Sequence, residues 1–182
     1  MHDDVLTPRL ILRLMSVPFL EACVAGDLVT AEKVIGLGLS EELHSSKHWM
    51  AIRINDLRTD PDYRPWSLRA IADATSGRMI GQIGFHSRPN PEYLRPFVGD
   101  GIELGYGVFT AYRRQGFAQE AIGGLVGWAA REHGVRNFVV SISPANIPAA
   151  ALARKLGFQK IGEHMDDEDG LEEVYVLKLA AP

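Results

Sequence analysis

The sequence predicts an α/β fold in which strands and helices alternate around one sheet. Apolar or aromatic side chains occupy every second position from residue 102 to residue 108, as in a half-buried strand. After Gly116, apolar residues recur at the spacing of one helical face as far as Ala129. The chain has 182 residues, a usual length for one domain with a sizeable core.

The first third of the chain is expected to hold one strand and two helices. The alternation over residues 7–14 predicts a strand, and residues 17–36 and 46–57 predict helices. Ser40 is followed by two acidic residues, which is typical of a helix N-terminus. The side chains expected to face inward are Leu10, Leu12, Leu14, Phe19, Leu20, Cys23, Val24, Trp49, Met50 and Ile52.

The middle of the chain predicts a strand pair followed by a long loop. Residues 66–72 and 79–85 are expected to be strands joined by a turn at 75–77. Three prolines in residues 86–100 exclude a regular strand through most of that segment. Long loops in compact domains are often functional, so we assign this loop to the substrate side.

The last third of the chain predicts a strand, a helix and two further strands. Residues 138–143 predict a buried strand, and Pro148 lies near the first turn of a helix that ends at Leu156. Residues 158–162 and 173–179 predict the final strands, separated by an acidic turn. The sequence shows no internal repeat and no boundary of a second domain.

Composition excludes several classes of function. Hydrophobic residues make up 46% and charged residues 23%, as in ordinary globular proteins, and the net charge of −4 argues against nucleic acid as the main ligand. The single cysteine, Cys23, excludes an intramolecular disulfide and suits a reducing cytoplasm. No signal peptide or membrane span is expected, and we interpret Gly123 and Gly127 as glycines of close helix–sheet packing.

The turn between the central strand and its helix has the chemistry of an anion site. It reads Arg113-Arg114-Gln115-Gly116-Phe117-Ala118. The first N–H groups of a helix have no helical acceptor and lie at the positive end of its dipole. Gly116 permits close approach of the backbone, and the two arginines add positive charge. These features suit a pyrophosphate, although a surface turn with solvated arginines is the alternative.

Two common nucleotide motifs are missing from this segment. No Gly-Lys-Ser/Thr follows the turn, so a P-loop is not indicated. Gly105 and Gly107 are followed by Thr110 where a dinucleotide fingerprint has its third glycine. Nucleotide hydrolysis and nicotinamide binding are therefore disfavoured.

Arg113-x-x-Gly116-x-Ala118 resembles the Gln/Arg-x-x-Gly-x-Gly/Ala signature of the GNAT superfamily of acyl-CoA-dependent N-acyltransferases. Glu103-Leu-Gly-Tyr and the Asn…Lys-x-Gly-Phe block over residues 146–158 resemble the branch that includes the ribosomal-protein N-terminal alanine and serine acetyltransferases, as does Thr7-x-Arg-Leu-x-Leu-Arg. The resemblance implies one GNAT domain over residues 1–182. Its sheet would be mixed and mostly antiparallel, splayed between the fourth and fifth strands, with helices on both faces.

The resemblance also implies where acetyl-CoA would bind. Its pantetheine arm would hydrogen-bond the strand edge near Tyr106 and Val108, and Arg113 and Arg114 would screen the pyrophosphate. Asn146 would contact pantetheine, with a turn or cap role as the alternative. The pyrophosphate would be held by backbone N–H groups of Gln115, Gly116, Phe117 and Ala118.

Glu103 matches the strand carboxylate that this branch is thought to use as a base. Burial beside apolar residues would raise its pKa, which suits a general base near neutrality. The alternative is a charge paired with an arginine, and Glu120 and His86 are competing candidates. Ala149 and Ala153 replace the hydroxyl residues of relatives, so no general acid is assigned, although Tyr112 or Tyr175 could substitute.

The function implied is transfer of an acetyl group from acetyl-CoA to a primary amine by direct attack. The amine would be a protein N-terminal α-amine or a small amine. A catalytically weak acyl-CoA-binding module is the alternative from another class, and use of succinyl-CoA is a third reading. We expect no metal site, nucleic acid or membrane partner, and a homodimer is left open.

Overall fold

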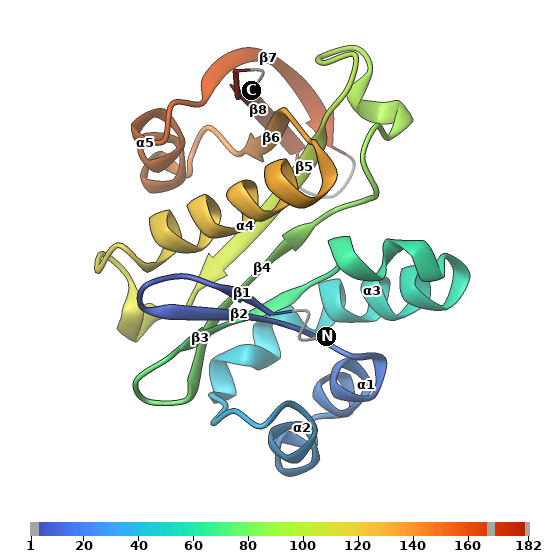
Figure 1. The fold of residues 1–182 in the computed structure, drawn as a ribbon, viewed down its shortest axis with the longest axis vertical. Coiled ribbons are helices and arrows are strands. Elements are labelled where there is room, and N and C mark those ends of the chain that lie inside the picture. The colour runs from blue at the N-terminus through green and yellow to red at the C-terminus, as the bar shows by residue number, and fades with distance from the viewer. Residues whose placement is uncertain (1–3, 167–169, 181–182) are drawn as a thin grey trace. The chain divides into compact units, whose positions relative to one another are not determined.

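The computed structural model describes residues 4–166 and 170–180, which form a mixed α/β fold (Figure 1). Eight strands form a sheet in the order β1-β2-β3-β4-β5-β6-β8-β7. The neighbours β1–β2, β2–β3, β3–β4, β6–β8 and β7–β8 are antiparallel, and β5–β6 is parallel. The mixed, mostly antiparallel sheet that the family resemblance implied is thereby confirmed.

The elements follow the predicted order with additions at the N-terminal end. The strands are β1 (Val5–Leu6), β2 (Leu10–Leu14), β3 (Arg69–Asp73), β4 (Arg78–Phe85), β5 (Ile102–Val108), β6 (Asn137–Ile142), β7 (Gln159–Asp166) and β8 (Gly170–Lys178). The α-helices are α1 (Val17–Ala25), α2 (Leu28–Ile35), α3 (Lys47–Thr59), α4 (Phe117–His133) and α5 (Ile147–Lys155). Short 3-10 helices are η1 (Glu41–Ser46), η2 (Pro61–Trp66), η3 (Glu92–Leu94) and η4 (Thr110–Tyr112).

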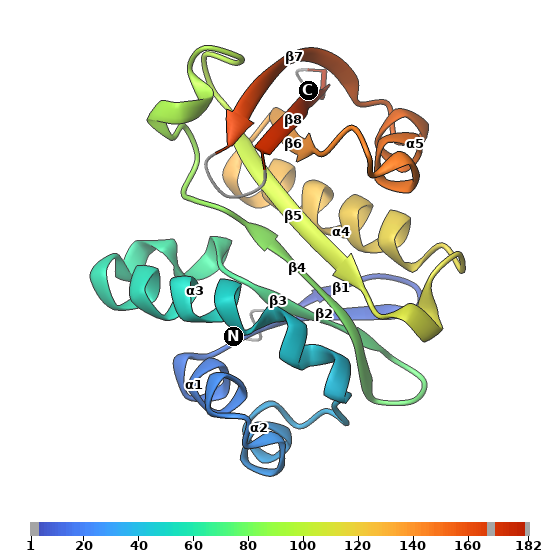
Figure 2. The same ribbon diagram turned by 180° about the vertical axis from the view of Figure 1, so that it is seen from behind.

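The chain packs as two compact units, residues 1–84 with 106–125 and residues 85–105 with 126–182. In the first unit, α1, α2 and α3 lie on one face of β2 and β3, in front in Figure 2, and the start of α4 lies on the other, in front in Figure 1. Successive side chains of β2 point to opposite faces of the sheet, and both faces are covered by helices. Leu10 and Leu12 are fully buried, as predicted, whereas Ile11 packs with the cluster under α1–α3.

The helix predicted over residues 17–36 is wrong, because the chain forms two helices there. Gly26 takes a left-handed conformation (φ 81°) and its N–H caps α1. Asp27 then accepts a hydrogen bond from the N–H of Thr30 and begins α2. A glycine C-cap followed at once by an aspartate N-cap ends one helix and begins the next, although the apolar residues on both sides continue the same helical pattern.

The third helix also differs in phase from the prediction. The predicted N-cap at Ser40 is confirmed, but it caps the 3-10 helix η1 that precedes α3. Trp49 was expected to face inward and is 40% exposed, whereas Met50 is fully buried. Arg53 and Ile54 share the buried face with Met50, since residues three and four apart lie on one side of a helix.

One cluster of buried residues in the second unit lies over β6 and β8. Its buried members are Leu94, Val98, Val139, Val174 and Val176, and Phe97 packs against them. The proline-containing loop of residues 86–100 therefore contributes side chains to this core through η3. The middle of the predicted acidic turn, residues 167–169, lies outside the described residues.

Close helix–sheet packing of α4 falls on a different glycine from those predicted. A Cβ at Gly124 would lie 2.5 Å from the Cγ2 of Thr7, whereas a Cβ at Gly123 would meet nothing within 4 Å and one at Gly127 would meet only the end of the Arg131 side chain. Gly124 is thus the position at which α4 approaches the β1–β2 hairpin. Within the described ranges, none of the helices has the length and apolar character needed to cross a bilayer.

Candidate active site

The segment that follows β5 is positioned by a carboxylate from η1. The backbone N–H of Thr110 donates to both carboxylate oxygens of Glu42, at 2.9 and 3.0 Å, and the Thr110 hydroxyl donates to the same group at 2.9 Å. The Nε of Arg113 donates to the Val108 carbonyl at 3.0 Å. These contacts fix the short helix η4 between the strand and the loop.

The loop itself turns through two left-handed residues before α4 begins. Arg114 has φ 61° and Gly116 has φ 82°. Among the described residues, no hydrogen bond engages the backbone N–H groups of Arg114 through Ala118. Successive unengaged N–H groups at the start of a helix form an anion-binding concavity. This geometry suits the pyrophosphate of acetyl-CoA.

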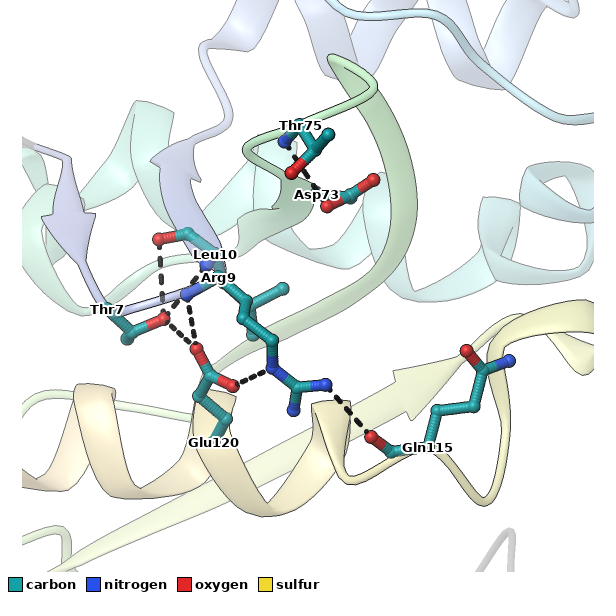
Figure 3. A network of polar contacts seen from close by, with 7 residues as sticks. All are labelled: Thr7, Arg9, Leu10, Asp73, Thr75, Gln115 and Glu120. Carbon is teal, nitrogen blue, oxygen red and sulfur yellow. Dashed lines mark hydrogen bonds and ion pairs between the residues drawn. The ribbon is translucent and has the colours of Figure 1, made fainter.

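The two loop arginines are arranged differently from each other. Arg113 is folded back onto the Val108 carbonyl, and its Nη2 lies 3.8 Å from Glu42, so part of its charge is already balanced. Arg114 is exposed, with its backbone held in the left-handed region. A third arginine reaches the loop from outside the motif. Arg9 donates to the carbonyl of Gln115 at 3.1 Å (Figure 3).

Glu120 is bound in the network of Figure 3. It accepts hydrogen bonds from the Thr7 hydroxyl at 2.6 Å, from the Arg9 N–H at 2.7 Å and from the Arg9 Nε at 2.6 Å. Partial burial raises the pKa of Glu120, but these donors and the Arg9 charge together hold it below its usual range. With three donors on one carboxylate, Glu120 has the contacts of a structural ion-pair residue rather than those of a general base.

The remaining predicted contacts for the acyl-CoA arm lie on strands and helix ends. Tyr106 and Val108 are half-buried in the second half of β5, and burial raises the pKa of the Tyr106 hydroxyl. Asn146 is the N-cap of α5, where its side-chain oxygen accepts from the N–H of Ala149 at 3.2 Å. The cap role is therefore present, and the pantetheine contact of Asn146 stays a prediction.

Glu103 is the most enclosed carboxylate among the described residues of the second unit, with 5% of its surface exposed. The Ser141 hydroxyl on β6 donates to its Oε1, and the Nδ1 of His86 lies 3.4 Å from its Oε2. The hydroxyl of Tyr93, in η3, also hydrogen-bonds it. Gly105 makes room for this arrangement, because a Cβ there would lie 2.5 Å from the Nε2 of His86.

The predicted rise in the pKa of Glu103 is wrong in direction. Burial does raise the pKa, but the hydrogen bond and charge of His86, with hydrogen bonds from Ser141 and Tyr93, outweigh it and lower the pKa. The partner is a histidine rather than the arginine considered as an alternative. The site is therefore an ionised carboxylate beside an imidazole, a side chain that can both donate and accept a proton.

Sequence reasoning found Glu103 and His86 separately and missed two of their neighbours. Ser141 lies two residues beyond Val139, which pairs with Glu103 in the parallel β5–β6 ladder, so the sheet register could have indicated it. Tyr93 lies in a proline-flanked loop whose sequence carries no periodic signal. The contact between two loops or strands far apart in sequence cannot be read from either segment alone.

Tyr175 does not have the surroundings of a general acid. Its side chain is fully buried, and its hydroxyl donates to Glu173 at 2.6 Å and accepts from Arg154 at 3.0 Å. Its pKa is raised, first because the hydroxyl donates to Glu173, and a higher pKa makes it a weaker proton donor. Tyr112 packs edge-on against Phe117 and onto the core of the first unit.

One group of side chains on the β7–β8 hairpin has metal-ligand chemistry. Ligand atoms of His164, Asp166 and Glu172 lie within 4.8 Å of one another, and the Nε2 of His164 is 3.5 Å from Glu172. These contacts are explained by cross-strand pairing, because His164 and Glu172 face each other in the β7–β8 register. The prediction of no metal site remains a prediction.

Comparison with known proteins identifies the family. The family model described as "Acetyltransferase (GNAT) domain" matches residues 9–159, which is most of the chain. The chain belongs to the GNAT acetyltransferase family, as the motif resemblance predicted. It is an enzyme of the acyl-CoA-dependent acetyltransferase class. No curated protein sequence matches it.

Solved structures share the fold over almost the full length. A GnaT-family acetyltransferase from Bordetella pertussis has 23% identity and a TM-score of 0.67, covering 96% of this chain and 98% of its own. A ribosomal-protein-S5-alanine acetyltransferase from Vibrio fischeri has 14% identity and a TM-score of 0.65, covering 96% of each chain. RimL, a ribosomal L7/L12 α-N-protein acetyltransferase in complex with coenzyme A, has 16% identity and a TM-score of 0.64, covering 97% and 98%.

Proposed function

We propose that residues 1–182 form a single acetyltransferase domain that transfers the acetyl group of acetyl-CoA to the α-amino group of a protein. The observation that carries the donor assignment is the loop before α4, where left-handed Arg114 and Gly116 leave consecutive N–H groups unengaged by protein acceptors among the described residues. The similar structure of RimL with coenzyme A supports this choice of donor.

The reaction is a direct transfer. The nitrogen of a neutral amine attacks the thioester carbonyl, a C–N bond forms, the C–S bond breaks and coenzyme A leaves as the thiolate. The amine proton passes to the Glu103–His86 pair, directly or through water. Positioning supplies much of such catalysis, and proton removal contributes about 10²–10⁴-fold.

The electrostatics of Glu103 favour an α-amine acceptor over a lysine. A carboxylate whose pKa is held low is a weak base, so it suits an amine of which a substantial fraction is already neutral. An α-amine of pKa about 8 is neutral in about a fifth of molecules at about pH 7.4, against about one in a thousand for a lysine of pKa about 10.4. Two of the similar structures are named for modifying ribosomal-protein N-termini or alanine, which points the same way.

The test compares matched peptide acceptors. One peptide has a free α-amine and no lysine, and the other has an acetylated N-terminus and one lysine. Release of coenzyme A thiol and the peptide mass are measured with acetyl-CoA and with succinyl-CoA. Acetylation of the first peptide alone supports the proposal, and equal rates on both peptides contradict it. Saturable coenzyme A binding without thiol release from any amine would establish the acyl-CoA-binding module instead.

A further inference from the structure

Arg9 reaches the acyl-CoA loop from the residue just before β2, far from the loop in sequence. Its Nε donates to Glu120 at 2.6 Å, its Nη1 donates to the Gln115 carbonyl at 3.1 Å, and its guanidinium lies 4.5 Å from the centre of the Phe117 ring. The Arg9 backbone is also held, because its N–H donates to Glu120 and its carbonyl accepts from Ala74. Figure 3 shows the side chain extending along the first turn of α4 to the loop.

The bond to the Gln115 carbonyl determines where the next N–H points. In a trans peptide the C=O and the N–H of one plane point in opposite directions, and the described chain has no cis peptide. With the Gln115 carbonyl directed at Arg9, the N–H of Gly116 is directed away from it. Gly116 has no side chain to oppose rotation of this plane, since glycine tolerates φ of either sign. The hydrogen bond from Arg9 is the described contact that holds the plane.

Arg9 also balances a charge that would oppose an anion. Glu120 lies in the first turn of α4, where its carboxylate is favourable for the helix but repels a phosphate bound at the same end. The Arg9 guanidinium at 2.6 Å offsets that charge. Arg9 has a further nitrogen, Nη2, which lies 3.3 Å from the place of a Cβ on Gly116.

We propose that Arg9 is a positioning residue of the acyl-CoA site that orients the Gln115–Gly116 peptide so that its N–H faces the pyrophosphate. This inference rests on the proposed use of acetyl-CoA. It assigns a role in donor binding to a residue outside the loop motif. Glu120 and Thr7 then act as the anchor for Arg9.

The experiment measures coenzyme A affinity and turnover for Arg9→Gln beside a matched control on the adjoining strand β2. Arg13 makes the same kinds of contact elsewhere, with its Nε on Asp4 at 3.1 Å and its Nη1 on the Ile35 carbonyl at 3.1 Å. Arg13→Gln therefore removes one ion pair and one carbonyl contact without touching the loop. Affinity is measured by calorimetry, and KM and kcat are measured with acetyl-CoA and with S-acetyl-pantetheine, which lacks the pyrophosphate.

For Arg9→Gln we expect coenzyme A to bind about 10- to 100-fold more weakly, as for a lost charged hydrogen bond, with kcat nearly unchanged. The KM for S-acetyl-pantetheine and for the amine should not move. Arg13→Gln should keep wild-type affinity. Equal coenzyme A affinity in Arg9→Gln and wild type would overturn the inference while leaving the proposed function intact. Absence of coenzyme A binding by the wild type would overturn both.

If Arg9→Gln unfolds the protein, Glu120→Gln provides the second test. It keeps the shape of the side chain and removes the charge that holds Arg9. We expect a smaller loss of coenzyme A affinity than in Arg9→Gln, with unchanged affinity for S-acetyl-pantetheine. A tighter binding of coenzyme A in Glu120→Gln would show that charge repulsion alone matters and would contradict the positioning role.

Discussion

Replacing Gly105 by alanine should separate His86 from Glu103 while leaving both residues in the chain. The new Cβ would lie 2.5 Å from the His86 Nε2, and ordinary contacts begin at 3.4 Å, so the ring must retreat by about 0.9 Å. The Nδ1–Oε2 distance of 3.4 Å is already at the limit of a hydrogen bond and leaves no room for that movement. The imidazole side chain is 43% exposed, so it can turn toward solvent instead of distorting β5.

The expected consequence is a loss of turnover with little loss of stability. Proton transfer is worth about 10²–10⁴-fold, so a misplaced pair should lower kcat by about 10- to 100-fold. The His86 side chain is 43% exposed and Glu103 keeps its hydrogen bond from Ser141, so loss of the pair should lower the free energy of unfolding by only about 1 kcal/mol. Because the change leaves the loop before α4 untouched, coenzyme A affinity should stay at the wild-type value.

The assay is kcat from thiol release between about pH 6 and pH 9, with unfolding and coenzyme A affinity measured on the same samples. Gly99→Ala is the control, since a Cβ there would meet nothing within 4 Å. A folded Gly105→Ala enzyme with wild-type kcat across this range would refute the pairing of His86 with Glu103 in proton transfer. Activity equally low in Gly99→Ala would show that the loss has another cause.

Three further outcomes follow from the same geometry. Gly116→Val should abolish the stabilisation of the folded protein by coenzyme A, because valine is strained at φ 82°. In the wild type this stabilisation should be about 2.7 kcal/mol when coenzyme A is at about 100 times its Kd. A melting-temperature shift equal to that of the wild type would contradict the loop assignment. Glu103→Gln should destabilise the fold at pH 7. The pKa of Glu103 is lowered in the folded state, so its ionised form stabilises the fold at pH values above the usual glutamate pKa of about 4.3. Denaturant titrations should therefore show a difference in the free energy of unfolding from wild type that shrinks as the pH falls below that value. Gly124→Ala should destabilise the protein more than Gly123→Ala in the same titration, because only the first meets Thr7 at 2.5 Å.

Local patterns were enough to predict most elements of this fold. The alternation of β5 and the helical spacing after Gly116 each depend on neighbours in sequence, and both elements are present. The errors lie where a local feature competes with the pattern. Gly26 and Asp27 break a continuous apolar helix pattern, and two adjacent apolar residues, Trp49 and Met50, left the phase of α3 ambiguous.

The electrostatics of the site could not be predicted in the same way, because they depend on contacts between distant segments. Burial alone gave the wrong direction for the pKa of Glu103, since the hydrogen bond and charge of His86, with a hydrogen bond from Ser141 38 residues away, outweigh it. Arg9 is 111 residues from Glu120, and nothing in either segment indicates the other. The residue types were readable from the sequence, but the hydrogen-bond partners were not.

The partners of three carboxylates explain why Glu103 is the strongest candidate for the base. Glu42 accepts three hydrogen bonds from Thr110, and Glu120 accepts three from Thr7 and Arg9, so backbone, hydroxyl and guanidinium donors engage both carboxylates. Glu103 also has several donors, but one of them is an imidazole. An imidazole can accept a proton as well as donate one, so a proton taken up at this pair can pass on through His86; neither of the other carboxylates has an imidazole among the hydrogen bonds described here.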